Sequence, residues 1–264
     1  MRKLVWCELY KLKRSKSLLL LTSLALLFPA ALTVFTKSSL ADAAGTAELH
    51  AYYDNLVNYT LAYGAMLLLP CLFGCVGALL FFSERDCDTF KNLQAIPVTR
   101  NQLIFAKLGV LYLWSELYAL CSGLAVTLFC FVLEPRTLYD VPFKLVCFLL
   151  AGLTMATVSL PVVVLVIYSN QSYLLSLLLS FLYAVVNWLL LILFASHEVL
   201  SLWLPLLNGL MFVSRLLAWR KAALGLASLT PLPSGTYLRV VLYLLFIFGV
   251  CVLLLVRFYK KWSR

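Results

Sequence analysis

Apolar residues along this chain come in long runs, broken by shorter polar or charged segments. A helix needs about 20 apolar residues to cross the hydrocarbon core of a bilayer. Six runs meet that length, and the expected crossings are residues 17–36, 59–82, 108–133, 143–168, 173–195 and 237–256. The pattern therefore predicts an all-α integral membrane protein with six transmembrane helices.

Residues 1–16 combine apolar and basic side chains in a different pattern. Leucine and valine recur at helical spacing, and Glu8, Lys11 and Arg14 lie between them. This arrangement is typical of an amphipathic helix that lies on the membrane surface and contacts anionic lipid. We expect such an interfacial helix here, and a basic leader without defined structure is the alternative.

Residues 196–236 do not follow the simple pattern of a crossing and its loops. Within them, 199–218 is apolar and just long enough to span, but Pro205 and the pair Asn208 and Gly209 interrupt its middle. A proline and an Asn-Gly pair leave backbone N–H and C=O groups without hydrogen bonds inside a helix, and lipid cannot satisfy those groups. We therefore expect an external re-entrant or interfacial hairpin before the last helix, and a seventh crossing is the alternative.

Composition and charge narrow the class further. The chain has 264 residues, of which 64% are hydrophobic and 12% charged, so we expect one transmembrane domain over 1–264 and no separate soluble domain. The net charge of +10 would suggest a nucleic-acid partner in a soluble protein. Here 14 of the 21 lysines and arginines fall in segments that we place in the cytoplasm. The surplus thus indicates a multi-pass protein of the cell membrane with both termini cytoplasmic, and no nucleic-acid partner.

Residues that could support catalysis are few. The two histidines are not at metal-ligand spacing, and the chain has no P-loop, so we expect no metal, no cofactor and no enzymatic activity. Glu116 does lie within an expected crossing, where a charge costs on the order of 2.5–3.5 kcal/mol. It either lines a pathway or a subunit interface, or bonds a neighbour such as Tyr112 in a structural helix contact.

The segment 83–107 is the longest charged stretch in the interior of the chain. It resembles the cytoplasmic loop of type-2 ABC transporter permeases in the order of its charged and turn residues. The residues that carry the resemblance are Ser83-Glu84-Arg85, Thr89, Pro97-Val98-Thr99-Arg100 and Lys107. The run that contains Glu8, Lys11 and Arg14 is similar to the surface helix of the same family. Asp86, Cys87 and Asp88 depart from the usual loop pattern.

The resemblance implies a membrane subunit that a separate ABC ATPase dimer drives, paired with a second copy or a sister permease. Glu84, Arg85, Thr89 and Arg100 would then contact the ATPase. A charged segment between two spans can pass the movement of a soluble partner to both of them. The alternative function is a non-transporting sensor or scaffold that binds a cytoplasmic partner through 83–107.

The substrate class also follows from resemblance. In length and in lacking a large external domain, the chain is similar to the permeases of bacitracin and lantibiotic resistance or immunity transporters. That implies export of an amphipathic antimicrobial peptide. The outer aromatic residues that could meet it are Tyr52, Tyr53, Trp203 and Trp219. Aromatic residues are equally expected there as anchors at the membrane interface.

Overall fold

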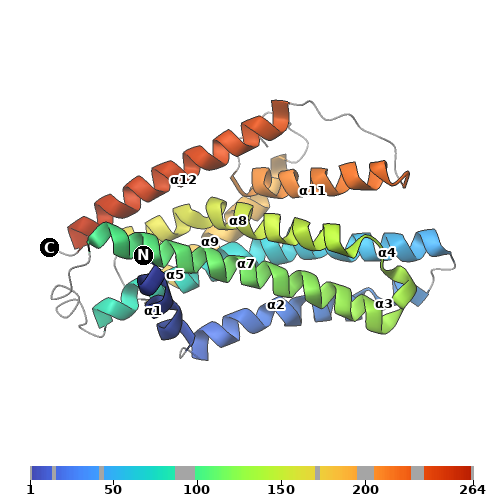
Figure 1. Ribbon diagram of the computed structural model, residues 1–264, viewed down its shortest axis with the longest axis horizontal. Coiled ribbons are helices and arrows are strands. Elements are labelled where there is room, and N and C mark those ends of the chain that lie inside the picture. The colour runs from blue at the N-terminus through green and yellow to red at the C-terminus, as the bar shows by residue number, and fades with distance from the viewer. Residues whose placement is uncertain are drawn as a thin grey trace.

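The computed structural model describes residues 2–13, 16–41, 45–86, 99–169, 173–194, 205–226 and 235–262. Every element in these ranges is helical, and six helical segments are long and apolar enough to cross a membrane (Figure 1). The prediction of an all-α protein with six transmembrane helices is therefore confirmed. The spanning segments are Lys16–Phe35, Thr46–Phe82, Asn101–Leu133, Val141–Ser169, Tyr173–Leu190 and Leu238–Phe258.

Most spans coincide with one helix each. They are α2 (Lys16–Phe35), α7 (Arg100–Leu133), α8 (Val141–Ser169), α9 (Tyr173–Phe194) and α12 (Gly235–Trp262). The second span is composite, and runs through α4 (Thr46–Tyr59), the π-helix η1 (Thr60–Leu68) and α5 (Leu69–Asp86). The remaining helices are α1 (Arg2–Lys13), α3 (Lys37–Ala41), the 3-10 turn η2 (Pro135–Thr137) and α11 (Pro205–Ala223).

The two ends of the bundle differ in what they bring together. At one end lie α1, the last turns of α5 and α12 and the first turn of α7, so both chain termini are there (Figure 1). We call this the terminal end. At the opposite end, which we call the distal end, lie the start of α4, the turn η2 and the last turn of α11 (Figure 1).

The polar stretch between the first two expected crossings is helical in its described parts, α3 and α4. A capping interaction begins α4, in which the Gly45 N–H donates to Glu48 Oε2 at 3.3 Å. Leu56 and Val57 are buried, so the apolar face of α4 joins the core and continues into η1. The helical segment that contains the second crossing therefore begins at Thr46, ahead of Tyr59.

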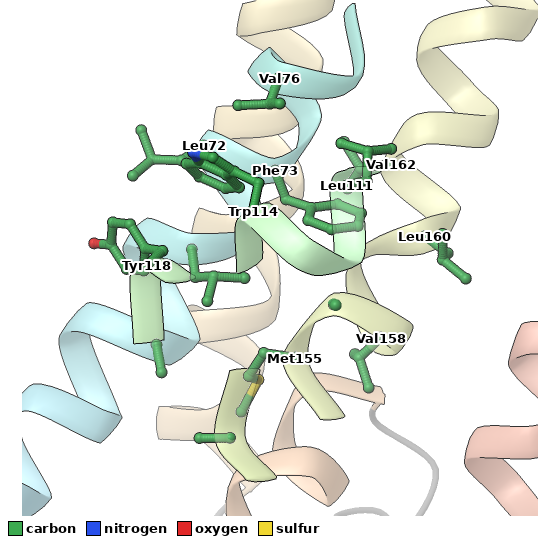
Figure 2. Close-up of a cluster of buried hydrophobic side chains, with 14 of the residues drawn as sticks. Leu72, Phe73, Val76, Leu111, Trp114, Tyr118, Met155, Val158, Leu160 and Val162 are labelled. Carbon is green, nitrogen blue, oxygen red and sulfur yellow. The ribbon is translucent and has the colours of Figure 1, made fainter. Parts of the chain in front are cut away.

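The centre of the bundle is formed by α5 and α8. Figure 2 shows the buried side chains there, with Leu72, Phe73 and Val76 from α5 beside residues of α7 and α8. On another face of α5, an added Cβ at Gly74 would lie 2.0 Å from Ser180 Oγ of α9. One at Gly77 would lie 3.1 Å from Val163 of α8. The small residues of the second crossing therefore serve contacts within the chain.

Helix α11 corrects one expectation about 196–236. Pro205 is its first residue, and Asn208 and Gly209 lie inside the helix and do not break it. A proline at the first helical position loses no hydrogen bond. An added Cβ at Gly209 would lie 3.5 Å from the Met155 side chain of α8, an ordinary packing distance, so α11 packs on α8 at this point. Residues 195–204 and 227–234 lie outside the described residues, so the re-entrant hairpin stays a prediction.

Candidate functional site

A buried lysine joins three helices at the terminal end of the bundle. Lys107 of α7 has a side chain with 0% exposure. Its Nζ donates to the Leu80 carbonyl of α5 at 2.5 Å and lies 3.4 Å from Glu8 Oε2 of α1. The same ammonium lies 5.3 Å from the centre of the Phe81 ring, within the range of a cation–π contact. Lys107 therefore connects α1, α5 and α7 through one charge.

The amphipathic pattern of α1 places Glu8 at this junction. Glu8 and Leu12 are buried, Val5 and Leu9 pack against the core, and Trp6 is exposed. One turn along, Lys11 Nζ donates to Glu8 Oε1 at 2.6 Å. The Glu8 carboxylate thus lies between two cations, one exposed and one buried. A buried charge is tolerated only when it is paired in this way, so the contact specifies how α1 sits on α7.

The start of α7 is set by a capping box at Thr99. The Gln102 N–H donates to Thr99 Oγ1 at 3.4 Å, and the Thr99 N–H donates to Gln102 Oε1 at 3.0 Å. Such a box satisfies two of the backbone groups that a helix leaves free at its first turn. Because Arg100 is then the first helical residue, Lys107 comes two turns later, level with Leu80. The capping box at Thr99 therefore marks the start of α7 two turns before Lys107.

The predicted coupling residues lie around this junction only in part. Glu84 and Arg85 belong to the last turn of α5, and Arg100 begins α7. Their side chains lie outside the described residues, as do Thr89 and Arg14 altogether. The structure thus brings Glu8, Lys11 and Lys107 together, and the roles of Glu84, Arg85, Thr89 and Arg100 stay predictions.

A second polar cluster lies at the distal end and was not foreseen from the sequence. Asp54 of α4 pairs with Lys144 of α8 at 2.8 Å and with Lys221 of α11 at 3.0 Å, and it accepts a hydrogen bond from Tyr139. The Lys144 ammonium lies 3.7 Å from the centres of both the Tyr53 and the Tyr139 ring. The overlooked signal was Lys144, a cation at the start of an expected crossing.

An ion pair beside this cluster holds α11 to the turn before α8. Arg220 Nε and Nη2 donate to the two carboxylate oxygens of Asp140 at 2.7 and 3.2 Å. This bidentate bond lowers the pKa of Asp140 below its ordinary value. Asp140 has a φ of 47°, a left-handed conformation that aspartate tolerates better than most residues. A cavity of about 150 Å³ lies between Asp140, Arg220 and the Asp54 cluster.

The four aromatic residues suggested as external contacts fall into three groups. Tyr52 and Tyr53 are buried in α4, where the Tyr52 hydroxyl bonds the Thr36 hydroxyl at 3.1 Å. Trp219 is half exposed on α11 near the distal end. Trp203 lies outside the described residues. Of these four residues Trp219 is therefore the described one with an exposed side chain, whereas Tyr52 and Tyr53 are covered by neighbouring helices.

Comparison with known families decides the class of the chain. The model of the family described as ABC-2 family transporter protein matches residues 4–187. The chain belongs to this family. It is therefore the membrane permease component of an ABC transporter, a transport part that is not itself catalytic, and membership of this family implies association with an ABC ATPase subunit. A search of curated proteins finds no match to the permease.

The matched region of the permease contains the junction at Lys107 and extends into α9. It also contains Glu116, which lies in the middle of α7. Tyr112 does not bond Glu116, because the Tyr112 hydroxyl bonds the Thr157 hydroxyl at 3.0 Å. Glu116 Oε1 is buried and has no hydrogen-bond partner among the described residues. Its Oε2 lies 3.3 Å from the position of an added Cβ at Gly152 of α8, so a pathway or interface role and a structural helix contact both stay predictions for Glu116.

Proposed function

We propose that this permease exports antimicrobial peptides of the lantibiotic or bacitracin type, driven by a separate ABC ATPase dimer that docks at the terminal end. The observation that carries the ATPase part of the proposal is the burial of Lys107 between α1, α5 and α7. The segment 83–107 connects α5 to α7. A force that an ATPase exerts on this segment would therefore act on the same two helices that Lys107 joins.

The junction explains how one docking event could move several helices together. A load on 83–107 acts on the end of α5 and on the start of α7. The Glu8 contact extends that load to α1, which is followed directly by the first span, α2. Packed helices move as rigid bodies, so a shift of the junction reaches the distal end of the long helix α7. In this arrangement the terminal end is cytoplasmic, and a second copy or a sister permease completes the pathway.

The distal end is where we place the encounter with the peptide. The re-entrant region 196–236 would form part of that surface, with Trp219 and Trp203 available to an amphipathic ligand. Helix α11 is held there by Asp140 and by the Asp54 cluster, so these ion pairs must be rearranged if α11 opens. Tyr52 and Tyr53 would become accessible in the same movement. The peptide class itself rests on the resemblance in length and in the small external part.

The test begins with docking. The tagged permease is expressed with the ABC ATPases of its own genome, and the wild type is compared with the Glu84→Ala, Arg85→Ala double variant. The control is Glu134→Ala, Arg136→Ala, which removes a similar pair of exposed charges at the distal end. We expect the wild type and the control to retain an ATPase and the first variant to lose it. If the wild type retains none, the ATPase part of the proposal is wrong and a sensor or scaffold is the better hypothesis.

Transport is tested separately, by survival of cells that express the permease and its ATPase in the presence of a lantibiotic or bacitracin. Wild-type cells should survive a higher concentration than cells that carry the Glu84→Ala, Arg85→Ala variant at equal expression. Equal survival with the variant, despite loss of the ATPase, would mean that the permease does not protect through ATP-driven export.

A further inference from the structure

The cavity at the distal end is small and has charged groups that a ligand can reach. It has a volume of about 150 Å³ and lies between α4, α8 and α11. Pockets that enclose a whole small ligand usually have about 300–1,000 Å³, so this one has room for a single chemical group of a larger molecule. Arg220 and Lys221 line it, and each of these side chains is 38% exposed. Two positive charges are therefore accessible from outside at this site.

Positive charge exceeds negative charge around the cavity. Among the residues that the structure describes, the charged ones in its lining are Asp54, Asp140, Lys144, Arg220 and Lys221. Three cations thus face two carboxylates, and the sum is +1. The Lys144 ammonium is buried against two tyrosine rings, so it adds charge to the site without offering an exposed donor. A site with this balance attracts an anion and repels a further cation.

The hydrogen-bonding groups indicate the same class of ligand. Both oxygens of Asp140 accept from Arg220. The two oxygens of Asp54 lie 2.8 and 3.0 Å from the ammonium groups of Lys144 and Lys221. A guanidinium group has five N–H donors and an ammonium group has three, so Arg220 and Lys221 keep donors beyond those that these contacts use. The acceptors of the cavity are therefore occupied, whereas its two exposed cations can still donate to an anion.

The level of the cavity along the helices indicates where that anion comes from. Asn58 and Phe143, which both line it, lie at the limits of the apolar runs expected at 59–82 and 143–168. At these limits the hydrocarbon core of a bilayer gives way to its headgroup layer. Leu224 is also in the lining and is 43% exposed, so apolar surface adjoins the charged groups. Basic pockets between transmembrane helices at this level are suited to the headgroups of anionic lipids.

We propose that the distal cavity binds the phosphate group of a membrane phospholipid, with Arg220 and Lys221 as its donors. A phosphate group offers charged oxygens to both cations at once, and charge-assisted hydrogen bonds of this kind are stronger than neutral ones. The bound lipid contacts α4, α8 and α11 together, so it holds α11 against the bundle. The inference goes beyond the proposed function, because a lipid site here does not depend on export of a peptide or on docking of an ATPase.

Binding is measured by native mass spectrometry on the purified permease in micelles of the neutral detergent dodecyl maltoside. The probes are dioleoylphosphatidylglycerol, dioleoylglycerol, which has the same chains without the phosphate, and inorganic phosphate. We expect the phospholipid to bind at least about tenfold tighter than dioleoylglycerol, since charged hydrogen bonds are lost with the phosphate. Lys221→Gln should lose that preference. Arg215→Gln, which removes a cation of α11 that does not line the cavity, should keep it.

A second pair of variants leaves every ion pair of the site in place. Ser214 lines the cavity from α11, and Ser214→Asp adds a carboxylate that brings the sum of charges from +1 to zero. We expect Ser214→Asp to lose the preference for the phospholipid, and Ser214→Asn, which has nearly the same size and no charge, to keep it.

Three results would overturn the proposal. The first is equal wild-type affinity for the two lipids. The second is an unchanged preference in either Lys221→Gln or Ser214→Asp. The third is displacement of the phospholipid by an equal concentration of inorganic phosphate, because the cavity would then be a site for the free anion and not for a lipid.

Discussion

The two lysines that flank Glu8 offer a direct measure of the junction at the terminal end. Lys107 and Lys11 both contact the Glu8 carboxylate, at 3.4 and 2.6 Å, but the Lys107 side chain is 0% exposed and that of Lys11 is 52% exposed. Replacement of each by methionine removes the charge and keeps most of the apolar stem. The pair of variants therefore compares a buried and an exposed cation on the same carboxylate.

The expected magnitudes differ because the surroundings differ. At 3.4 Å, with an effective dielectric constant of about 20, the attraction between Lys107 and Glu8 is about 5 kcal/mol before desolvation is subtracted. Removing one partner of a buried pair commonly costs about 3–5 kcal/mol. Since Glu8 keeps Lys11, we expect Lys107→Met to lower the free energy of unfolding by about 2–3 kcal/mol. An exposed ion pair contributes about 0–1 kcal/mol, so we expect Lys11→Met to lower the free energy of unfolding by no more than that.

A double-mutant cycle separates the pair from its surroundings. The free energy of unfolding is measured by titration with sodium dodecyl sulfate in mixed micelles for the wild type, Glu8→Gln, Lys107→Met and both together. We expect a coupling energy of about 1–2 kcal/mol between the two positions. The remainder of the Lys107→Met effect should persist in the double variant, because the hydrogen bond to the Leu80 carbonyl is lost whatever residue occupies position 8.

Two outcomes would refute this reasoning. A coupling energy below about 0.5 kcal/mol would mean that α1 is not held to α7 by this charge pair. Equal effects of Lys107→Met and Lys11→Met would mean that burial does not distinguish the two lysines. In either case the junction could not transmit a load from 83–107 to α1.

Two further changes test the packing of α5 and the distal ion pair. Gly74→Ala should lower the free energy of unfolding by about 1–3 kcal/mol, since its Cβ would lie 2.0 Å from Ser180 Oγ. Gly249→Ala, which meets no atom within 4 Å, should be neutral or stabilising in the same titration. Asp140→Asn should lower the thermal unfolding midpoint at neutral pH, because the pKa of Asp140 is lowered by Arg220 and the ion pair is intact there. That difference should narrow below pH of about 4 and vanish once the pH passes the lowered pKa, and a constant difference down to pH 2 would contradict the assignment.

The positions of the spans could be read from the sequence because a bilayer imposes a local rule. Each crossing must be apolar over about 20 residues and must satisfy its own backbone as a helix. The runs that became α2, α8 and α12 meet this rule without help from other parts of the chain. Their limits in the structure fall within a few residues of the expected ones.

This rule does not predict helices whose polar side chains are paired with residues far away in the sequence. Asp54 made the stretch before Tyr59 look too polar to continue the second crossing, yet its carboxylate is paired with Lys144 and Lys221 from two other helices. Likewise, the Asn208 and Gly209 pair reads as a break, but packing of α11 on α8 keeps those residues helical. Local patterns do not contain these contacts, so neither helix could be assigned from them.

The candidate site, like the fold, has features that the sequence determines and features that depend on packing. The sequence by itself determined the class of protein, the six crossings and the charged segment 83–107, because hydropathy and the resemblance of short motifs are properties of neighbouring residues. Only the tertiary structure decided that Glu8 meets Lys107, 99 residues further along the chain, and that Glu116 has no partner on Tyr112. Whether a buried charge is paired depends on which helices pack together, and that is a property of the whole bundle.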